Sequence, residues 1–441
     1  MKKNVFGRRR AINYALFAGG AITASTQFRF ISTSFGFEET FSGFDGQTIN
    51  WGGITSLYSD GAIELPNVSK ALKKVEPGSA VPVLDDVLQK AIASVDPSVW
   101  EQKGFRLSIG EGGKGGTARF GMIMGVAAEL TIQDSRTEIN SFTVLRLIAY
   151  NFIFKADKLG ARVIACYPVG GRVYNAQDGL DKTPISKYYL NMFTTKSAAG
   201  DTIADWYSTK LKNYPFEEIK IGLDYRVTTV KLGDKAKKGL MRLGIVENTF
   251  IDWVGFATTM SFGEKLKVSM VPFKNRTGDL QTFFRDGTAF NLQLPKGDIQ
   301  ITPKIHMWKI EYKDHPRDPN QFAQKISVFV QIRIQSVDFN DEKKIIFNQL
   351  LYGVEVQAVF KNEEYRRSDS ATIFLLIEKI CDETFHATID PKKRTQLLKG
   401  LEQKFTTTER NREIKPYIKI KVHKQTAAKF AQECENVLQP F

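Results

Sequence analysis

Two long runs of alternating apolar residues constrain the fold of this chain more than any other feature. The first run is apolar at every second position from 120 to 132: Phe120, Met122, Met124, Val126, Ala128, Leu130 and Ile132. The second has the same period: Ile326, Val328, Val330, Ile332 and Ile334. A period of two residues is typical of a β-strand with one apolar face. Strands of this length must pair with other strands and pack against another layer to bury that face.

A polar turn and a returning apolar strand follow each run. The first turn, 134–138, leads to an apolar run at 142–154, and the second turn, 338–342, leads to Val354, Val356, Ala358 and Phe360 in phase. We therefore predict long hairpins at 120–154 and 326–360. The matching turns are consistent with two related halves and equally with two unrelated amphipathic hairpins. The predicted domains are a basic leader, two β-rich halves and a helical, basic C-terminal region, at 1–25, 26–212, 213–365 and 366–441.

Helical patterns lie before the first hairpin and after the second. Apolar residues recur at helical spacing from Val83 to Val95, and the segment 371–385 is apolar enough for a buried helix. Asp390 followed by Pro391 is a typical helix start. A strand is expected at 414–424 and a last helix from Thr426 to Leu438. The predicted fold class is α+β, mainly antiparallel β with long hairpin arms and a helical C-terminal region.

The stretch SIGEGGKGGTARFG, residues 108–121, has the glycines and the lysine of a phosphate-binding loop. In such a loop the lysine precedes Ser or Thr, and a helix follows. Here Gly115 follows Lys114, and the segment that follows has the period of a strand. We predict a structural hairpin tip without a nucleotide. The four histidines and three cysteines show no metal-ligand spacing. We therefore expect no cofactor, no metal and no enzymatic activity.

The charge balance predicts an anionic partner. The formal net charge is +14 and the pI is about 9.4, which favours nucleic acid, lipid headgroups or an acidic protein face. A solvated basic surface is the alternative. The candidate anion-binding residues come from the basic C-terminal stretch: Lys392, Lys393, Arg394, Lys419 and Lys421. The lysines of the strand at 414–424 also fit a charged edge strand that blocks unwanted pairing.

The N-terminus begins MKKNVFGRRRAINYALFAGGAITAS, in which cations precede an apolar stretch that ends in small residues. That order is typical of a signal peptide and predicts the periplasm or cell envelope. An uncleaved basic arm is the alternative, and it predicts a cytoplasmic assembly or a virion.

Three segments resemble the curli-secretion outer-membrane lipoprotein family: KVSMVPFKNRTGD at 267–279, the strand pair with its polar turn at 324–360, and GEGGKGGTARFG with AELTIQDSRTE. In that family, hairpins from many subunits join into one membrane barrel. The resemblance implies that Ile326 to Ile334 and Val354 to Phe360 are positions in its wall. No cysteine follows the leader, so the resemblance does not extend to a lipid anchor.

These features together predict a non-enzymatic structural subunit of a large homo-oligomer, in an envelope secretion or surface machine. A structural protein of a phage-like or virus-like particle and a basic nucleic-acid-binding protein are the alternatives. The predicted oligomerisation residues are apolar positions of the second hairpin: Ile326, Val328, Val330, Ile332, Ile334, Val354, Val356 and Phe360.

Overall fold

The computed structural model describes residues 44, 46–57, 65–79, 81–109, 120–134, 140–157, 160–178, 182–196, 202–214, 224–273, 279–283, 289–295, 297–315, 318–337, 343–362, 369–399, 417–423 and 427–438. The predicted leader and residues 110–119 of the glycine-rich stretch lie outside these residues. Residues 41–441 form one compact unit.

The elements before residue 215 are β1 (Thr48–Ser56), α2 (Val68–Leu72), α3 (Val83–Ala93), α4 (Pro97–Gln102), β2 (Arg106–Ser108), β3 (Phe120–Asp134), β4 (Asn140–Asp157), β5 (Gly160–Asp178), α5 (Ile185–Thr194) and α6 (Ile203–Asn213). Those after it are β6 (Tyr225–Val227), β7 (Lys231–Leu232), α7 (Asp234–Arg242), α8 (Glu247–Leu266), β8 (Met270–Val271), β9 (Asp279–Phe283), β10 (Ala289–Gln293), β11 (Ile299–Asp314), β12 (Gln321–Val337), β13 (Lys343–Phe360), α9 (Asp369–Ile389), α10 (Pro391–Leu398), β14 (Tyr417–Val422) and α11 (Ala427–Leu438).

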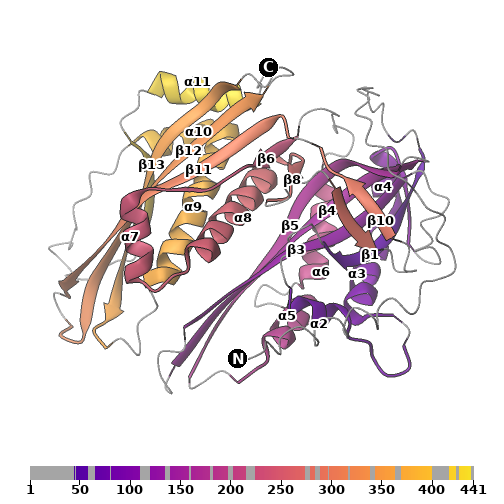
Figure 1. Ribbon diagram of the computed structural model, residues 1–441, viewed down its shortest axis with the longest axis horizontal. Helices are drawn as coiled ribbons and strands as arrows, with labels where there is room; N and C mark the ends of the chain where they lie inside the picture. The colour runs from indigo at the N-terminus through magenta and orange to yellow at the C-terminus, as the bar shows by residue number, and fades with distance from the viewer. Residues whose placement is uncertain are drawn as a thin grey trace, which may run out of the picture. The chain divides into compact units, whose positions relative to one another are not determined.

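The strands form two mixed sheets, and the predicted α+β class is confirmed (Figure 1). The first sheet has the order β2-β1-β3-β4-β5-β10-β9, and the second has the order β14-β13-β12-β11-β6-β8. The long neighbouring strands pair antiparallel, as in β3–β4 and β12–β13. The short strands pair in both ways: β1 with β3 and β6 with β11 are parallel, whereas β9 with β10 and β13 with β14 are antiparallel. The prediction of mainly antiparallel pairing is therefore confirmed only in part.

Both sheets share one topology. In each, a first strand pairs parallel with a second strand on one side and with a third on the other, and two antiparallel strands follow. The order equates β1, β2, β3, β4 and β5 with β6, β8, β11, β12 and β13. The hairpin at 120–154 thus corresponds to β11–β12. The similar turns had suggested β12–β13 instead, which is one strand too late.

Helices cover one face of the first sheet. Helices α3, α5 and α6 contribute Leu88, Phe193 and Tyr207 to a buried cluster with β3, β4 and β5. Helix α6 begins with a capping box formed by Thr202 and Asp205. The Tyr207 hydroxyl donates a 2.5 Å hydrogen bond to the buried Asn151 side chain of β4.

The other face of the first sheet, which we call the junction face, packs against α8. This face carries Ile123, Ile148, Tyr150 and Phe152, all nearly inaccessible to solvent. Helix α8 is apolar around most of its circumference, as expected for a helix buried on all sides. A Cβ added to Gly170 of β5 would lie 3.1 Å from the Met260 methyl group of α8, so the absence of a side chain permits this close approach.

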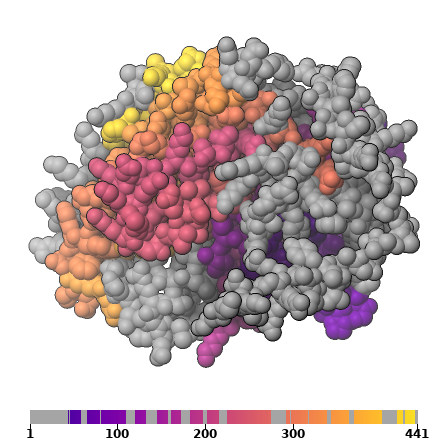
Figure 2. Space-filling model, viewed as in Figure 1, coloured from indigo at the N-terminus to yellow at the C-terminus, as the bar shows by residue number. Residues whose placement is uncertain are grey.

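Helices α7, α8, α9 and α11 also pack on the second sheet. Gly239 of α7 lies against the Trp308 ring of β11, and Gly353 of β13 lies against Ile380 of α9. Figure 1 shows α9 running along β12 and β13. The segment of α7 and α8 forms part of the surface drawn in Figure 2. Trp308 and Gly353 both pair with Val328 of β12, so the contacts with α7 and α9 fall on the same face of the sheet, which we call the helix face.

Several local predictions are confirmed. The stripe from Val83 forms α3, the apolar segment 371–385 lies within α9, and the strand expected at 414–424 contains β14. The Asp390 side chain accepts a 2.8 Å hydrogen bond from the Lys392 amide at the start of α10.

Candidate functional site

The predicted oligomerisation stripe is core. Its members on β12 are completely buried within this single chain: Ile326, Val328, Val330, Ile332 and Ile334. They lie on the helix face, because Val328 pairs with Gly353, whose backbone contacts α9. The prediction that a partner subunit covers these side chains is therefore wrong. Other parts of the same chain bury them, which also conflicts with the barrel-wall positions implied by the family resemblance.

The apolar residues of β13 that were expected in phase with this stripe lie on the opposite face. Val354 pairs with Ser327 and Val356 with Lys325, one residue out of step with the stripe. Val354 and Val356 are buried, whereas Phe360 at the end of β13 is 48% exposed. Directly paired residues share a face, so a one-residue difference in register reverses the assignment. These residues cannot form one surface with Ile326 to Ile334.

The face opposite the helix face carries the off-phase residues of β12, and we call it the polar face: Lys325, Ser327, Phe329, Gln331 and Arg333. Pairing places residues of neighbouring strands beside them in rows. The central row is Met307, Phe329, Tyr352 and Lys421. A row on one side is Lys309, Ser327, Val354 and Lys419. The row on the other side contains Lys231, Lys304, Gln331 and Leu350.

An aromatic pair occupies the centre of the polar face. The ring centroids of Phe329 and Tyr352 lie 4.6 Å apart with an interplanar angle of 37°. His423 meets Phe329 edge-on at 6.4 Å, and the Lys421 ammonium lies 6.0 Å from the Tyr352 ring centroid. Phe329, Tyr352 and His423 are partly exposed. Partly exposed rings beside a cation are suited to contact a planar or anionic ligand.

The charges of the polar face are almost all positive. Lys304, Lys309, Lys325, Arg333, Lys419 and Lys421 lie on it, and Glu311 is the carboxylate among them. Glu311 accepts from Lys309 at 2.8 Å and lies 3.5 Å from Lys325. The hydrogen bond from Lys309 lowers the pKa of Glu311. Glu311 is therefore ionised at neutral pH, and its charge is already shared between two lysines.

Polar side chains connect the strands beside the aromatic pair. His306, at a bulge in β11, lies 3.0 Å from Gln331 of β12, and Gln331 donates a 2.8 Å hydrogen bond to Asn348 of β13. The Ser327 and Tyr352 hydroxyls lie 3.2 Å apart. These cross-strand contacts hold the side chains of β11, β12 and β13 in fixed relative positions.

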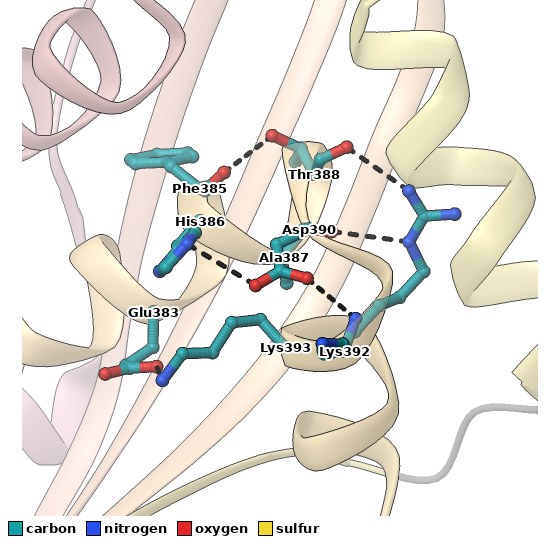
Figure 3. A network of polar contacts seen from close by, with 9 residues as sticks. Glu383, Phe385, His386, Ala387, Thr388, Asp390, Lys392 and Lys393 are labelled. Carbon is teal, nitrogen blue, oxygen red and sulfur yellow. Dashed lines mark hydrogen bonds and ion pairs between the residues drawn. The ribbon is translucent and has the colours of Figure 1, made fainter.

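The predicted anion-binding residues separate into two groups. Lys419 and Lys421 lie on the polar face. Residues 392–394 lie on α10, where Lys393 reaches Glu383 at 3.0 Å and the Lys392 amide caps the helix on Asp390 (Figure 3).

Arg394 also makes contacts that stabilise the fold. It donates to the Ala387 and Thr388 carbonyl oxygens at the end of α9, and it pairs with Glu435 of α11 at 3.1 Å. Lys393 and Arg394 are therefore occupied by structural contacts, which argues against the prediction that they bind an external anion.

Several residues of the polar face were missed by the sequence prediction: Lys304, Lys309, Phe329, Arg333 and Tyr352. A signal for Phe329 and Arg333 was present, because they occupy the alternate positions of the apolar stripe on β12. The contribution of β11 could not be recognised in the same way, because that strand was not predicted.

Other groups with potential chemistry are buried. Cys166, Cys381 and Cys434 are free and buried, and burial raises the pKa of each thiol, to about 12 for Cys381 and Cys434. Within the described ranges, no three His, Cys, Asp or Glu side chains lie close enough to hold a metal ion. In that same part of the chain, no helix has the length and apolar character needed to cross a membrane.

Comparison with known proteins gives no further identification. No protein-family model matches the sequence, and no curated protein is detectably similar to it.

Proposed function

We propose that this protein is a non-enzymatic binding protein whose polar face holds an extended polyanion. The observation that carries the proposal is the charge of that face. Lys304, Arg333 and Lys421 lie on three strands of one sheet, β11, β12 and β14, and the carboxylate Glu311 is already paired with two lysines. A surface of this kind attracts an anionic polymer and releases its counterions.

Binding fits the local chemistry better than turnover does. A nucleophilic hydroxyl needs a general base within hydrogen-bond distance. On the polar face, the Ser327 hydroxyl instead contacts the Tyr352 hydroxyl, and His306 contacts the side chain of Gln331. These contacts supply shape and rigidity to the sheet surface.

Heparin, a sulfated polysaccharide, tests the charge proposal without reference to bases or lipids. We expect it to bind at low salt, with an affinity that falls as ionic strength rises. The triple variant Lys304→Gln, Arg333→Gln and Lys421→Gln should lower the slope of log affinity against log salt by about 0.7–0.9 for each lost contact. Titration calorimetry at a series of salt concentrations measures this slope.

A matched triple variant controls for net charge. Lys235→Gln, Lys238→Gln and Lys392→Gln remove the same charge from exposed positions on α7 and α10. This variant should leave the slope close to that of the unmodified protein. An equal loss in both variants, or no heparin binding at low salt, would contradict the proposal.

Self-association is a second candidate function, favoured by the edge strand β14. Among the described residues, β14 pairs with β13 on one side and with no strand on the other. Ile418 of β14 is 47% exposed, and an edge with an exposed apolar residue can pair with another chain. We therefore place the expected homo-oligomer contact on β14 and not on the β12 stripe.

Sedimentation velocity tests this second candidate. If β14 edges pair, Ile418→Lys should shift the protein towards monomer, because it places a charge at the contact. Ile389→Lys is the control, since Ile389 is similarly exposed, at 44%, but lies at the end of α9. A monomeric unmodified protein at tens of micromolar would refute self-association and leave the polyanion proposal intact.

The two candidate functions bear differently on the three roles that the sequence predicted. A particle subunit that faces packaged nucleic acid combines both functions. An envelope machine would require anionic lipid or polysaccharide as the partner of the polar face. A basic nucleic-acid-binding protein needs the polar face alone.

A further inference from the structure

We propose that the polyanion held by the polar face is a single-stranded nucleic acid, whose bases stack at Phe329 and Tyr352 while its phosphates contact the flanking cations. This inference rests on the proposed function and deepens it. It depends on a feature that charge alone does not require, which is the aromatic pair in the middle of the basic surface.

The first argument is the position of the aromatic rings. Phe329 and Tyr352 are directly paired across β12 and β13, and both rings are partly exposed. The exposed part of each ring leaves apolar surface in contact with water, and a ligand can cover it. Every unpaired base has an apolar π-face that can cover such a ring, and this stacking tolerates any sequence.

The second argument is the arrangement of cations around the rings. Lys421 lies in the same row as Phe329 and Tyr352, and Lys309 and Lys419 lie in the next row. Lys419 and Lys421 are two residues apart on one strand, a separation of about 6.8 Å. Cations spaced in this way can follow successive phosphates of an extended strand while the bases reach the rings between them.

The third argument concerns the shape of the ligand. The rows of the polar face are read from pairing along β11, β12, β13 and β14, and the side chains project from one sheet surface. A single-stranded nucleic acid can lie on such a surface with its bases facing the aromatic rings. In a duplex the base faces are stacked inside, so a duplex can contact the same surface through its phosphates and groove edges but cannot stack a base on the rings.

A labelled twenty-nucleotide oligodeoxythymidylate tests the inference by fluorescence anisotropy. Replacing Phe329→Leu or Tyr352→Leu keeps an apolar side chain but removes the ring. Loss of a stacked base should weaken oligodeoxythymidylate binding by about 5- to 100-fold for each ring. Tyr352→Phe retains the ring and should bind within about twofold of the unmodified protein.

Heparin and duplex DNA of the same length are the comparison ligands. The two leucine variants should leave the affinity for both unchanged, because these ligands use charge alone. An equal loss for all three ligands, or no loss for oligodeoxythymidylate, would overturn the stacking inference. Salt-dependent heparin binding by the unmodified protein would still support the proposed function, so the two proposals fail separately.

Two further measurements decide between the remaining possibilities. Phosphatidylserine vesicles should bind less well than oligodeoxythymidylate, and aromatic-dependent vesicle binding would assign the face to a membrane instead. Photocrosslinking of bromodeoxyuridine-substituted oligonucleotide to the unmodified protein needs no variant to fold. Crosslinks should fall on peptides that contain Phe329 or Tyr352, and crosslinks confined to other peptides would refute the inference.

Discussion

The two sheets share a topology but differ in the face that turns away from their own helices. In the first sheet, the junction face presents Ile148, Tyr150 and Phe152 from β4, all buried against the region of α8. In the second sheet, the equivalent positions of β12 present Ser327, Phe329 and Gln331 on the polar face. One arrangement of strands therefore supports two surfaces of opposite character.

The difference follows from what covers each face. Helices α8 and α9 belong to the second half of the chain, yet they contribute to a buried cluster that includes both sheets. The junction face of the first sheet is thus apolar because these helices bury it. Within the described part of the chain, no helix makes the corresponding contact with the polar face. The polar face differs in that its central residues, Phe329 and Tyr352, are partly exposed.

The largest expected effect comes from placing a charge on the helix face of the second sheet. In Val330→Asp, a carboxylate replaces a side chain that is completely buried. Burying an unpaired charge costs several kcal/mol, a large part of the stability of a typical domain. We expect loss of the folded state, measured as loss of the cooperative urea transition by circular dichroism.

Arg333→Asp is the matched change on the other side of the same strand. Arg333 is exposed on the polar face, so its replacement should alter the free energy of unfolding by no more than about 0.5 kcal/mol. A folded, stable Val330→Asp protein would contradict the assignment of the stripe to the core and restore its predicted role in assembly.

The next effect concerns the ion pair that joins the junction face to α9. Arg146 of β4 pairs with Glu378 of α9, and both side chains are nearly buried. Arg146 also lies 5.6 Å from the Trp253 ring of α8. Arg146→Met removes the cation that is paired with the buried Glu378 carboxylate, which should cost about 3–5 kcal/mol.

The double variant Arg146→Met with Glu378→Leu separates charge from packing. Replacing both partners by apolar side chains removes the uncompensated charge, so most of the lost stability should return. Urea unfolding of the two single variants and the double variant completes the cycle. A double variant as unstable as Arg146→Met would show that shape, and not charge, holds this contact.

The pH dependence of stability tests a second contact between the halves. Asp224, next to β6, is only 9% exposed and accepts from Ser269 at 3.1 Å, while Ser269 accepts from the Cys166 amide of β5. Burial, with a smaller contribution from Asp298, raises the pKa of Asp224 to about 7, against a hydrogen bond from Ser269 and the charge of Arg162, which lower it.

A raised carboxyl pKa means that the folded state holds the proton more tightly than the unfolded state. This contribution to stability is complete below the unfolded pKa of 3.8 and is lost as the pH rises through about 7. The loss could reach on the order of 4 kcal/mol. Asp224→Asn cannot ionise, so urea unfolding between pH 4 and pH 8 should show a smaller decline for the variant. Parallel profiles for the two proteins would contradict the assignment.

The sequence predicted the elements whose patterns are local. The stripe in α3, the Asp390–Pro391 start of α10 and the alternation in β3 and β12 each follow from neighbouring residues. Helix α8 was missed because it is apolar on most sides and shows no single stripe. The parallel strands β6 and β8 span only three and two residues, too few for a period to be recognised.

The candidate site was harder to predict because it depends on register. The sequence showed that Val354 and Val356 alternate, but only the pairing of β13 with β12 decides which face they share. The same register brings Tyr352 beside Phe329 and Lys421, which are distant in the chain. Lysines on α10 and β14 looked equivalent as a basic run, and their separate roles emerged from tertiary contacts.

The smallest expected effect concerns two cations of α10, Arg394 and Lys392. Arg394 bonds the last carbonyl oxygens of α9 and pairs with Glu435 of α11, whereas Lys392 contributes its backbone amide to the cap of α10. Arg394→Gln should therefore lower the free energy of unfolding by about 1–2 kcal/mol, because it removes charged hydrogen bonds at a helix C-terminus. Lys392→Gln keeps the backbone amide and should change the free energy of unfolding by less than about 0.5 kcal/mol.

Neither variant should alter heparin affinity at constant salt, since α10 does not form part of the polar face. Urea unfolding and calorimetry on the same two proteins measure both quantities. A loss of heparin affinity in Arg394→Gln without a loss of stability would return this residue to the anion-binding set predicted from the sequence.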